Sequence, residues 1–134
     1  MQTSIRDRAV EFLAGTASYG DGVGEVESLS VLADYAAHLT SLVPLQGERP
    51  LRIVVDAANG MAGLTVPVVF GEARGIEIIP MYFELDGSFP NHEANPLEPA
   101  NLVDLQAAVL REHADLGLAF DGDADRCFVI DELR

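Results

Sequence analysis

The sequence predicts an α/β fold: a three-layer α/β/α sandwich around a mixed sheet of four strands. Three short apolar stretches, at residues 51–56, 76–83 and 116–120, have strand character and are separated by segments with helical periodicity. The order strand–helix–strand–helix–strand is typical of parallel strands joined by right-handed crossovers. A fourth stretch, at residues 128–130, follows the third after a loop too short for a helix, so we expect it to run antiparallel.

The first 27 residues look irregular or weakly helical, and we expect them to be a linker or the tail of a preceding domain. Residues 6–13 are long enough for two helical turns. The domain itself is expected to span residues 28–134 and to open with an amphipathic helix, with Ser28 or Ser30 as its N-cap. The apolar face of this helix is predicted from spacings of three and four: Leu29, Leu32, Ala36, Leu39 and Val43.

The remaining elements follow from strand and breaker signals. A loop of small residues at 57–63 leads into a helix expected over residues 65–74, because Pro67 limits where that helix can start. Residues 85–97 contain prolines and asparagines and are predicted to form a long loop. Pro99 then suits the first turn of a last helix. Its buried face is predicted to consist of Leu102, Leu105, Ala108 and Val109.

The charge of the chain argues against several partners. With 8 basic and 22 acidic residues the net charge is −14, which repels the phosphates of nucleic acids and of anionic membranes. No apolar run approaches the ~20 residues of a membrane-spanning helix, and the N-terminus lacks the apolar stretch of a signal peptide. The single cysteine, Cys127, excludes an internal disulfide. We therefore expect a cytoplasmic protein that binds neither nucleic acid nor membrane.

The strongest chemical signal is the segment 121–126 (DGDADR), directly after the third strand. Three carboxylates, of Asp121, Asp123 and Asp125, alternate with small residues, and such close acids repel one another unless a cation lies among them. Mg²⁺ prefers oxygen ligands and is the cation we expect. The segment also lies where open α/β sheets place their sites, at the carboxyl end of a strand.

Arg126 has two interpretations. It either balances the carboxylates as an internal ion pair or contacts a phosphate in fork geometry. We favour the phosphate contact, because a metal ion would already neutralise the acids.

Three other interpretations of this segment compete with a Mg²⁺ site for phosphoryl transfer. An EF-hand has acids at positions one, three and five, and Glu132 falls at position twelve, but Arg126 occupies position six, where glycine is needed. A haloacid-dehalogenase-like phosphatase also has Asp-x-Asp after a strand, but it needs a long chain beyond it. A plain acidic turn between strands is the third, since turns favour Asp and Gly.

In its context the segment resembles the α-D-phosphohexomutases, the phosphomannomutase/phosphoglucomutase family, and bacterial phosphomannomutases in particular. Three stretches match in order: residues 55–63 (VDAANGMAG), 89–96 (FPNHEANP) and 121–126 (DGDADR). The similarity runs from about Leu29 to the C-terminus and corresponds to the second of the family's four domains.

The resemblance implies the chemistry. In the family a phosphoserine of the first domain exchanges its phosphoryl group with a hexose 1- or 6-phosphate through a bisphosphate. Asp121, Asp123 and Asp125 would hold the Mg²⁺, and Arg126 would contact the phosphoryl group or substrate. The serine loop, the sugar loop of domain III and the phosphate loop of domain IV are not found in the sequence. We therefore expect a domain of a longer protein, inactive alone, with no readable preference for mannose or glucose.

Several positions carry more specific expectations. Ala124 stands where many members of the family have glycine, and we expect a negative φ there. Asn59 and Gly60 are expected to turn the chain from strand to helix, since both tolerate positive φ. His92 is expected to be an ordinary loop histidine bonded to the backbone. The alternatives to a mutase domain are a free-standing metal- or phosphate-binding module and a small acidic phosphatase.

Overall fold

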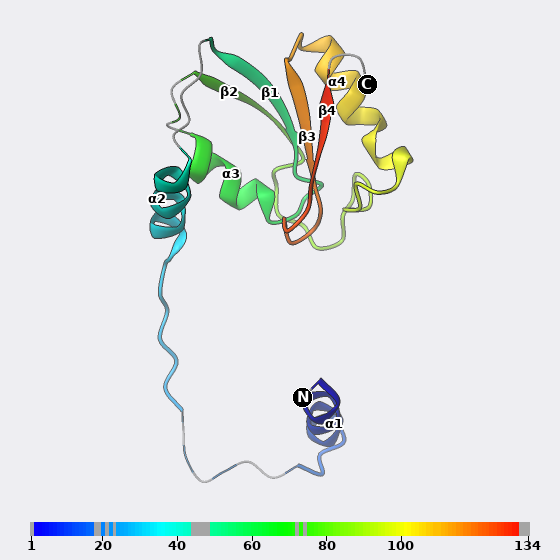
Figure 1. Cartoon of the computed structure of the whole chain (residues 1–134). Helices are drawn as coiled ribbons and strands as arrows, with labels where there is room; N and C mark the ends of the chain where they lie inside the picture. The colour runs from blue at the N-terminus through cyan, green and yellow to red at the C-terminus, as the bar shows by residue number, and fades with distance from the viewer. Residues whose placement is uncertain are drawn as a thin grey trace.

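The computed structural model describes residues 2–17, 20, 22, 24–43, 49–71, 73 and 75–131. Its centre is a four-stranded sheet in the order β2-β1-β3-β4 (Figure 1). β1 pairs in parallel with β2 and β3, whereas β3 and β4 are antiparallel. The predicted mixed sheet with an antiparallel last strand is confirmed. The strands are β1 (Leu51–Asp56), β2 (Ile76–Met81), β3 (Leu116–Phe120) and β4 (Cys127–Asp131).

Helices cover the two faces of the sheet, as predicted. α3 (Ala62–Phe70) packs on one face, and α2 (Leu32–Leu42) packs against α3. The short 3₁₀ helix η1 (Pro99–Leu102) and α4 (Val103–Arg111) lie on the other face (Figure 1). The three layers of the α/β/α sandwich follow from this arrangement.

The core alternates across β1, because successive strand residues point to opposite faces. Ile53 and Val55 pack with Val66 on the α3 side. Val54 packs with Leu105 and neighbouring residues on the α4 side. The predicted buried face of the last helix is confirmed: Leu105, Ala108 and Val109 are buried, and Leu102 packs partly buried against them.

Two predicted helix starts are wrong. α2 begins at Leu32 with Val31 at the N-cap and no side-chain cap, so neither Ser28 nor Ser30 caps it, and Leu29 is 84% exposed. α3 begins at Ala62, before the predicted residue 65, and contains Pro67 in its interior. Burial of its apolar side chains against the sheet outweighs the cost of an internal proline. Residue 74, where the prediction ended this helix, lies outside the described residues.

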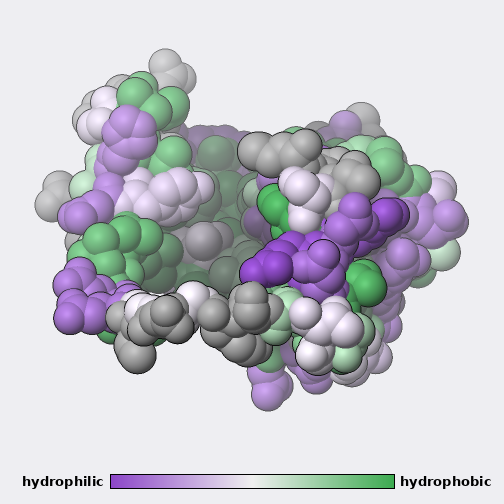
Figure 2. Space-filling model, turned by 90° about the horizontal axis from the view of Figure 1, so that it is seen from below, coloured by the Kyte–Doolittle hydropathy of each residue, from purple (hydrophilic) through white to green (hydrophobic). Residues whose placement is uncertain are grey.

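The N-terminal helix α1 (Gln2–Leu13) lies apart from the sheet at the end of an extended segment (Figure 1). It includes the predicted turns at residues 6–13 and extends them toward the N-terminus. None of the described helices is long and apolar enough to cross a membrane. Seen from below, the surface mixes hydrophilic and hydrophobic residues (Figure 2).

Candidate metal centre

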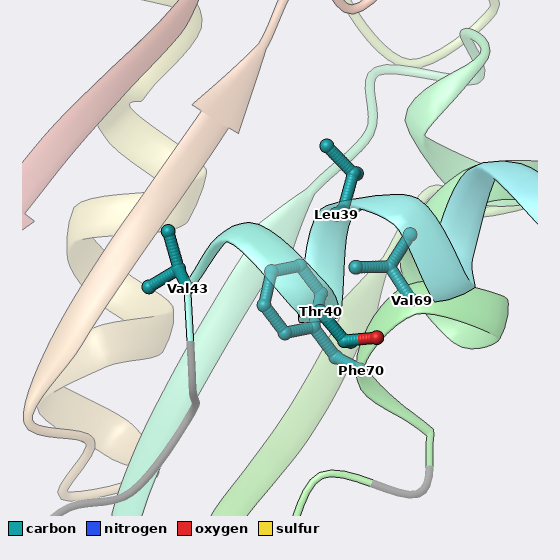
Figure 3. A pocket seen from close by; sticks show the side chains of 5 residues that line it. All are labelled: Leu39, Thr40, Val43, Val69 and Phe70. Carbon is teal, nitrogen blue, oxygen red and sulfur yellow. The ribbon is translucent and has the colours of Figure 1, made fainter.

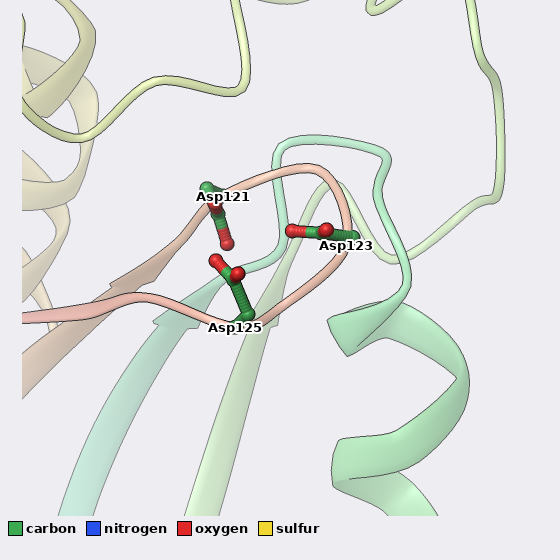
Figure 4. Close-up of side chains that lie close together, drawn as sticks. All are labelled: Asp121, Asp123 and Asp125. Atoms are coloured by element: carbon green, nitrogen blue, oxygen red, sulfur yellow. The ribbon is translucent and has the colours of Figure 1, made fainter. Parts of the chain in front are cut away.

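Residues 121–126, here called the aspartate loop, connect β3 to β4 at the carboxyl end of β3. The structure brings the three predicted carboxylates together: one oxygen of each of Asp121, Asp123 and Asp125 lies within 4.8 Å of the others. Their side chains point toward a common centre (Figure 4). The flanking elements are strands rather than helices, which contradicts an EF-hand. Glu132, its twelfth position, lies outside the described residues.

Asp121 is the buried anchor of the loop, at 1% exposure, whereas Asp123 and Asp125 are exposed. Its Oδ1 accepts the backbone N–H of Arg126 at 3.1 Å, and its carbonyl accepts that of Ala124 at 3.1 Å. Burial raises the pKa of Asp121, but the Arg126 backbone N–H and guanidinium together hold that pKa below its ordinary value. The carboxylate is therefore ionised at neutral pH.

The second carboxylate oxygen of Asp121 is buried and faces the Arg126 guanidinium. Oδ2 lies 2.5 Å from Arg126 Nη2, yet among the described residues it is the buried side-chain polar atom without a hydrogen bond of regular geometry. A buried anionic oxygen is stabilised by positive charge, and a metal ion beside the guanidinium would add to that charge. Three carboxylate oxygens are the hard ligands that Mg²⁺ prefers, and they leave coordination positions for water or phosphate oxygens. The residues present therefore fit the ion.

Arg126 is engaged with the loop itself. Its Nη2 contacts Asp121 and its Nε lies 3.2 Å from Asp125 Oδ1. This is the ion-pair arrangement that the sequence left as the less favoured interpretation, and contact with a phosphate stays a prediction. The side chain of Arg126 is 54% exposed, so donors beyond the two ion pairs remain accessible from solvent.

The expected negative φ at Ala124 is wrong, since its φ is +60°. The tight return of the loop, closed by the bond between the Ala124 N–H and the Asp121 carbonyl, places this residue in the left-handed region. Most non-glycine residues of positive φ among those described lie in loops around this site, where strain is commonly held at functional positions. These are Ala58, Asn59, Tyr82, Phe89 and Ala124, with His113 elsewhere.

The loop after β1 supports the aspartate loop from one side. The Met61 backbone N–H donates to the Gly122 carbonyl at 3.0 Å. Asn59 has φ +60°, as its expected turning role requires, but Gly60 is not in the left-handed region. Gly60 is needed for close approach instead, because a Cβ there would lie 2.7 Å from the Gly122 oxygen.

Sequence reasoning missed a buried pair beside this support. Asp56, the last residue of β1, is 1% exposed, and its Oδ2 lies 2.9 Å from His92 Nε2. The expected backbone bond of His92 is confirmed, between Nδ1 and the Glu93 oxygen at 2.9 Å. The other ring nitrogen, Nε2, makes the bond to Asp56 that was not expected. Burial raises the pKa of Asp56, and the Ala58 N–H and His92 oppose that rise. The sequence did hold one sign of this pair: Asp56 ends an apolar strand, and an acid in a buried position needs a polar partner.

Hollows lie beside α2 and α3. One of about 260 Å³ lies between α2 and α3 and is lined by Leu39, Thr40, Val43, Val69 and Phe70 (Figure 3). A second of about 260 Å³ continues toward the aspartate loop. It is lined by Tyr35, Leu39, Thr65, Val66, Val69, Phe70, Phe120, Asp123 and Ala124.

Comparisons with known proteins agree with this geometry. Residues 33–134 match the family model described as phosphoglucomutase/phosphomannomutase, alpha/beta/alpha domain II. A phosphomannomutase/phosphoglucomutase of Pseudomonas aeruginosa is 47% identical over 109 residues, which are 81% of this chain and 23% of that protein. A phosphoglucomutase of Neisseria meningitidis is 38% identical over 110 residues, 82% of this chain and 23% of that protein.

A solved structure shows the same relationship. The crystal structure of a phosphoglucomutase/phosphomannomutase family protein from Burkholderia thailandensis superposes with a TM-score of 0.77 at 33% identity. The match covers 97% of this chain and 27% of that one. The chain thus spans about a quarter of the length of these relatives.

Proposed function

Because the chain belongs to the phosphoglucomutase/phosphomannomutase family, in which it matches domain II, we propose that it is the Mg²⁺-binding domain of a phosphohexomutase. The complete enzyme interconverts the 1- and 6-phosphates of mannose, glucose or both, through a phosphoserine and a hexose 1,6-bisphosphate. Residues 28–134 form this domain, and residues 1–27 belong to the tail of a preceding one. The observation that carries the proposal is the convergence of three carboxylates within 4.8 Å on one loop.

Each carboxylate has its own part in the proposed site. Asp121 holds the loop in shape with Oδ1 and offers Oδ2 to the ion, while Asp123 and Asp125 complete the ligand set from the exposed side. Bound Mg²⁺ supplies positive charge that stabilises the oxygens of a transferred phosphoryl group. The chain itself contributes the ligands and their fixed spacing.

Arg126 is proposed to contact the phosphoryl group or the substrate. A guanidinium presents planar paired donors that match phosphate oxygens. It is half exposed and shares Asp121 Oδ2 with any cation held there. A positively charged group at this point also offsets the net charge of −14, which otherwise repels a phosphorylated sugar.

The domain is proposed to be inactive alone. The phosphoserine, sugar-recognition and phosphate-binding loops of the family were not identified in the sequence, and the chain spans about a quarter of its relatives' length. Its partners are then the hexose phosphate and domains I, III and IV of the same enzyme. A cytoplasmic location suits the single cysteine, Cys127.

Activity assays of two proteins test this function. The chain alone should convert neither mannose 1-phosphate nor glucose 1-phosphate, and joined to the other three domains it should convert at least one of them. In the joined protein, Asp123→Asn should lower kcat by at least about 100-fold, while Asp34→Asn, an exposed acid of α2, should leave it unchanged. Turnover of a generic phosphate ester by the chain alone, lost in Asp123→Asn, would instead establish a small phosphatase.

A further inference from the structure

Residues 85–98, here called the histidine loop, contact the aspartate loop at Gly122. Phe89 and Ala94 both approach Gly122: a Cβ added there would lie 3.3 Å from the Phe89 ring and 3.7 Å from the Ala94 Cβ. The histidine loop has no helix or strand of its own. Its position must therefore be set by specific side-chain and backbone bonds.

The bond between His92 and Asp56 is the first of these bonds. His92 Nδ1 faces the Glu93 carbonyl, which can only accept, so Nδ1 carries a proton. Nε2 faces the Asp56 carboxylate at 2.9 Å, and that contact also needs a proton between the two atoms. With Asp56 at 1% and His92 at 15% exposure, this is a buried hydrogen bond that joins the end of β1 to the histidine loop.

Asn59 makes the second set of bonds, and both its side-chain amide and its backbone groups take part in hydrogen bonds. Its side chain donates to the Glu84 carbonyl at 2.8 Å and accepts from Asn91 Nδ2 at 2.8 Å. Its backbone N–H donates to the Tyr82 carbonyl at 2.8 Å, and its carbonyl accepts the Asp86 N–H at 3.0 Å. The loop after β1 and the histidine loop are thus bonded into one unit.

This unit holds Gly122 from two sides, through the Met61 bond on one and the contacts of Phe89 and Ala94 on the other. We propose that His92 is a positioning residue for the aspartate loop: by bonding Asp56 it holds the histidine loop against Gly122 and so fixes the spacing of the three carboxylates. That this spacing matters for Mg²⁺ binding rests on the proposed function, whereas the effect of His92 on the position of the aspartate loop does not.

Amide hydrogen exchange of this chain, followed by NMR, tests the proposal without any metal. In His92→Ala the amides of Met61, Ala124 and Arg126, which all make bonds of the aspartate loop, should exchange about tenfold faster. Amides in the pairing of β1 with β3 should be unchanged. His92→Gln keeps an N–H for the Asp56 carboxylate and should restore most of the protection. His38→Ala, an exposed histidine of α2, is the control and should change nothing.

The outcomes separate this proposal from the proposed function. Unchanged exchange of the aspartate loop in His92→Ala, or an equal acceleration over the whole sheet, overturns the positioning role. Titration of the same samples with MgCl₂ should show weaker binding in His92→Ala than in His92→Gln. If the wild-type chain shows no response to Mg²⁺ while the exchange pattern is as expected, the positioning role stands and the metal site fails.

Discussion

The Met61 N–H and the Gly122 carbonyl form a hydrogen bond of 3.0 Å, which joins the start of α3 to the aspartate loop. The two residues are far apart in the sequence but meet at the carboxyl edge of the neighbouring strands β1 and β3. The backbone of the aspartate loop is thus attached to the sandwich at a point between its first two acids. Changes at this contact should reach the metal ligands.

Gly60→Ala tests the contact by steric pressure. The new Cβ would lie 2.7 Å from the Gly122 oxygen, where backbone must move. We expect a loss of about 1–3 kcal/mol in the free energy of unfolding, measured by urea denaturation. Gly87→Ala is the matched control, because nothing lies within 4 Å of its added Cβ. Equal losses in the two variants would contradict a specific contact.

Ala124→Gly tests the strain of the loop. Ala124 has φ +60°, a conformation that glycine adopts at little cost. The variant should be more stable by about 0.5–1 kcal/mol in thermal or urea unfolding. Ala107→Gly, at an exposed position inside α4, should lose about 1 kcal/mol instead. A loss of stability in Ala124→Gly would show that the left-handed residue is not strained.

Asp115→Asn tests acid stability at the opposite edge of the sheet. The pKa of Asp115 is lowered, first by the side chain of Arg49 at 2.6 Å and then by the Arg52 N–H at 2.8 Å. Its folded pKa lies below the unfolded value of about 4, so its stabilisation is present above that pH and is lost as the pH falls. Asp115→Asn should be less stable at pH 7, and the difference in unfolding free energy should shrink toward about pH 2. A constant difference over this range would refute the charge effect.

Asp56→Asn tests the proton between Asp56 and His92. The pKa of Asp56 is raised by burial, so the folded state holds the proton more tightly, and this stabilisation is lost as the pH rises through that pKa. Asp104 adds to the rise, and Tyr82, whose hydroxyl bonds Asp104, lies edge-on to His92. An asparagine can donate to a neutral His92 and needs no extra proton.

The melting temperature should report the difference. As the pH rises above about 4, the unfolded pKa of an aspartate, the melting temperature of the wild-type chain should fall more steeply than that of Asp56→Asn. Parallel profiles would show that no proton is held between the two side chains.

Much of the fold was predictable because its strands are short apolar runs bounded by turn residues. The bounds of β1 and β3 and the buried face of α4 were predicted from such local patterns. The start of α3 was not, because burial of Ala62 and Val66 outweighs the local preference of Pro67. These two side chains stabilise the helix by packing against the sheet, and such contacts between distant residues cannot be read from the sequence around Pro67.

The candidate site shows the same division. Alternating acids predicted which side chains converge, since their spacing lies within one loop. The φ of Ala124 and the Asp56–His92 bond depend on how loops distant in sequence fold together, so residue type alone did not indicate them. Asp56 and His92 are separated by a helix and a strand.

The central claim is tested most directly by a residue-resolved NMR titration of this chain with Mg²⁺, followed by trace Mn²⁺. Asp123 is the residue to change, because it is exposed and Asp121 also holds the loop together. We predict shifts and broadening centred on residues 121–126, abolished in Asp123→Asn and retained in Asp34→Asn. No localised response of the wild-type chain up to millimolar Mg²⁺ would contradict a metal centre formed by this domain.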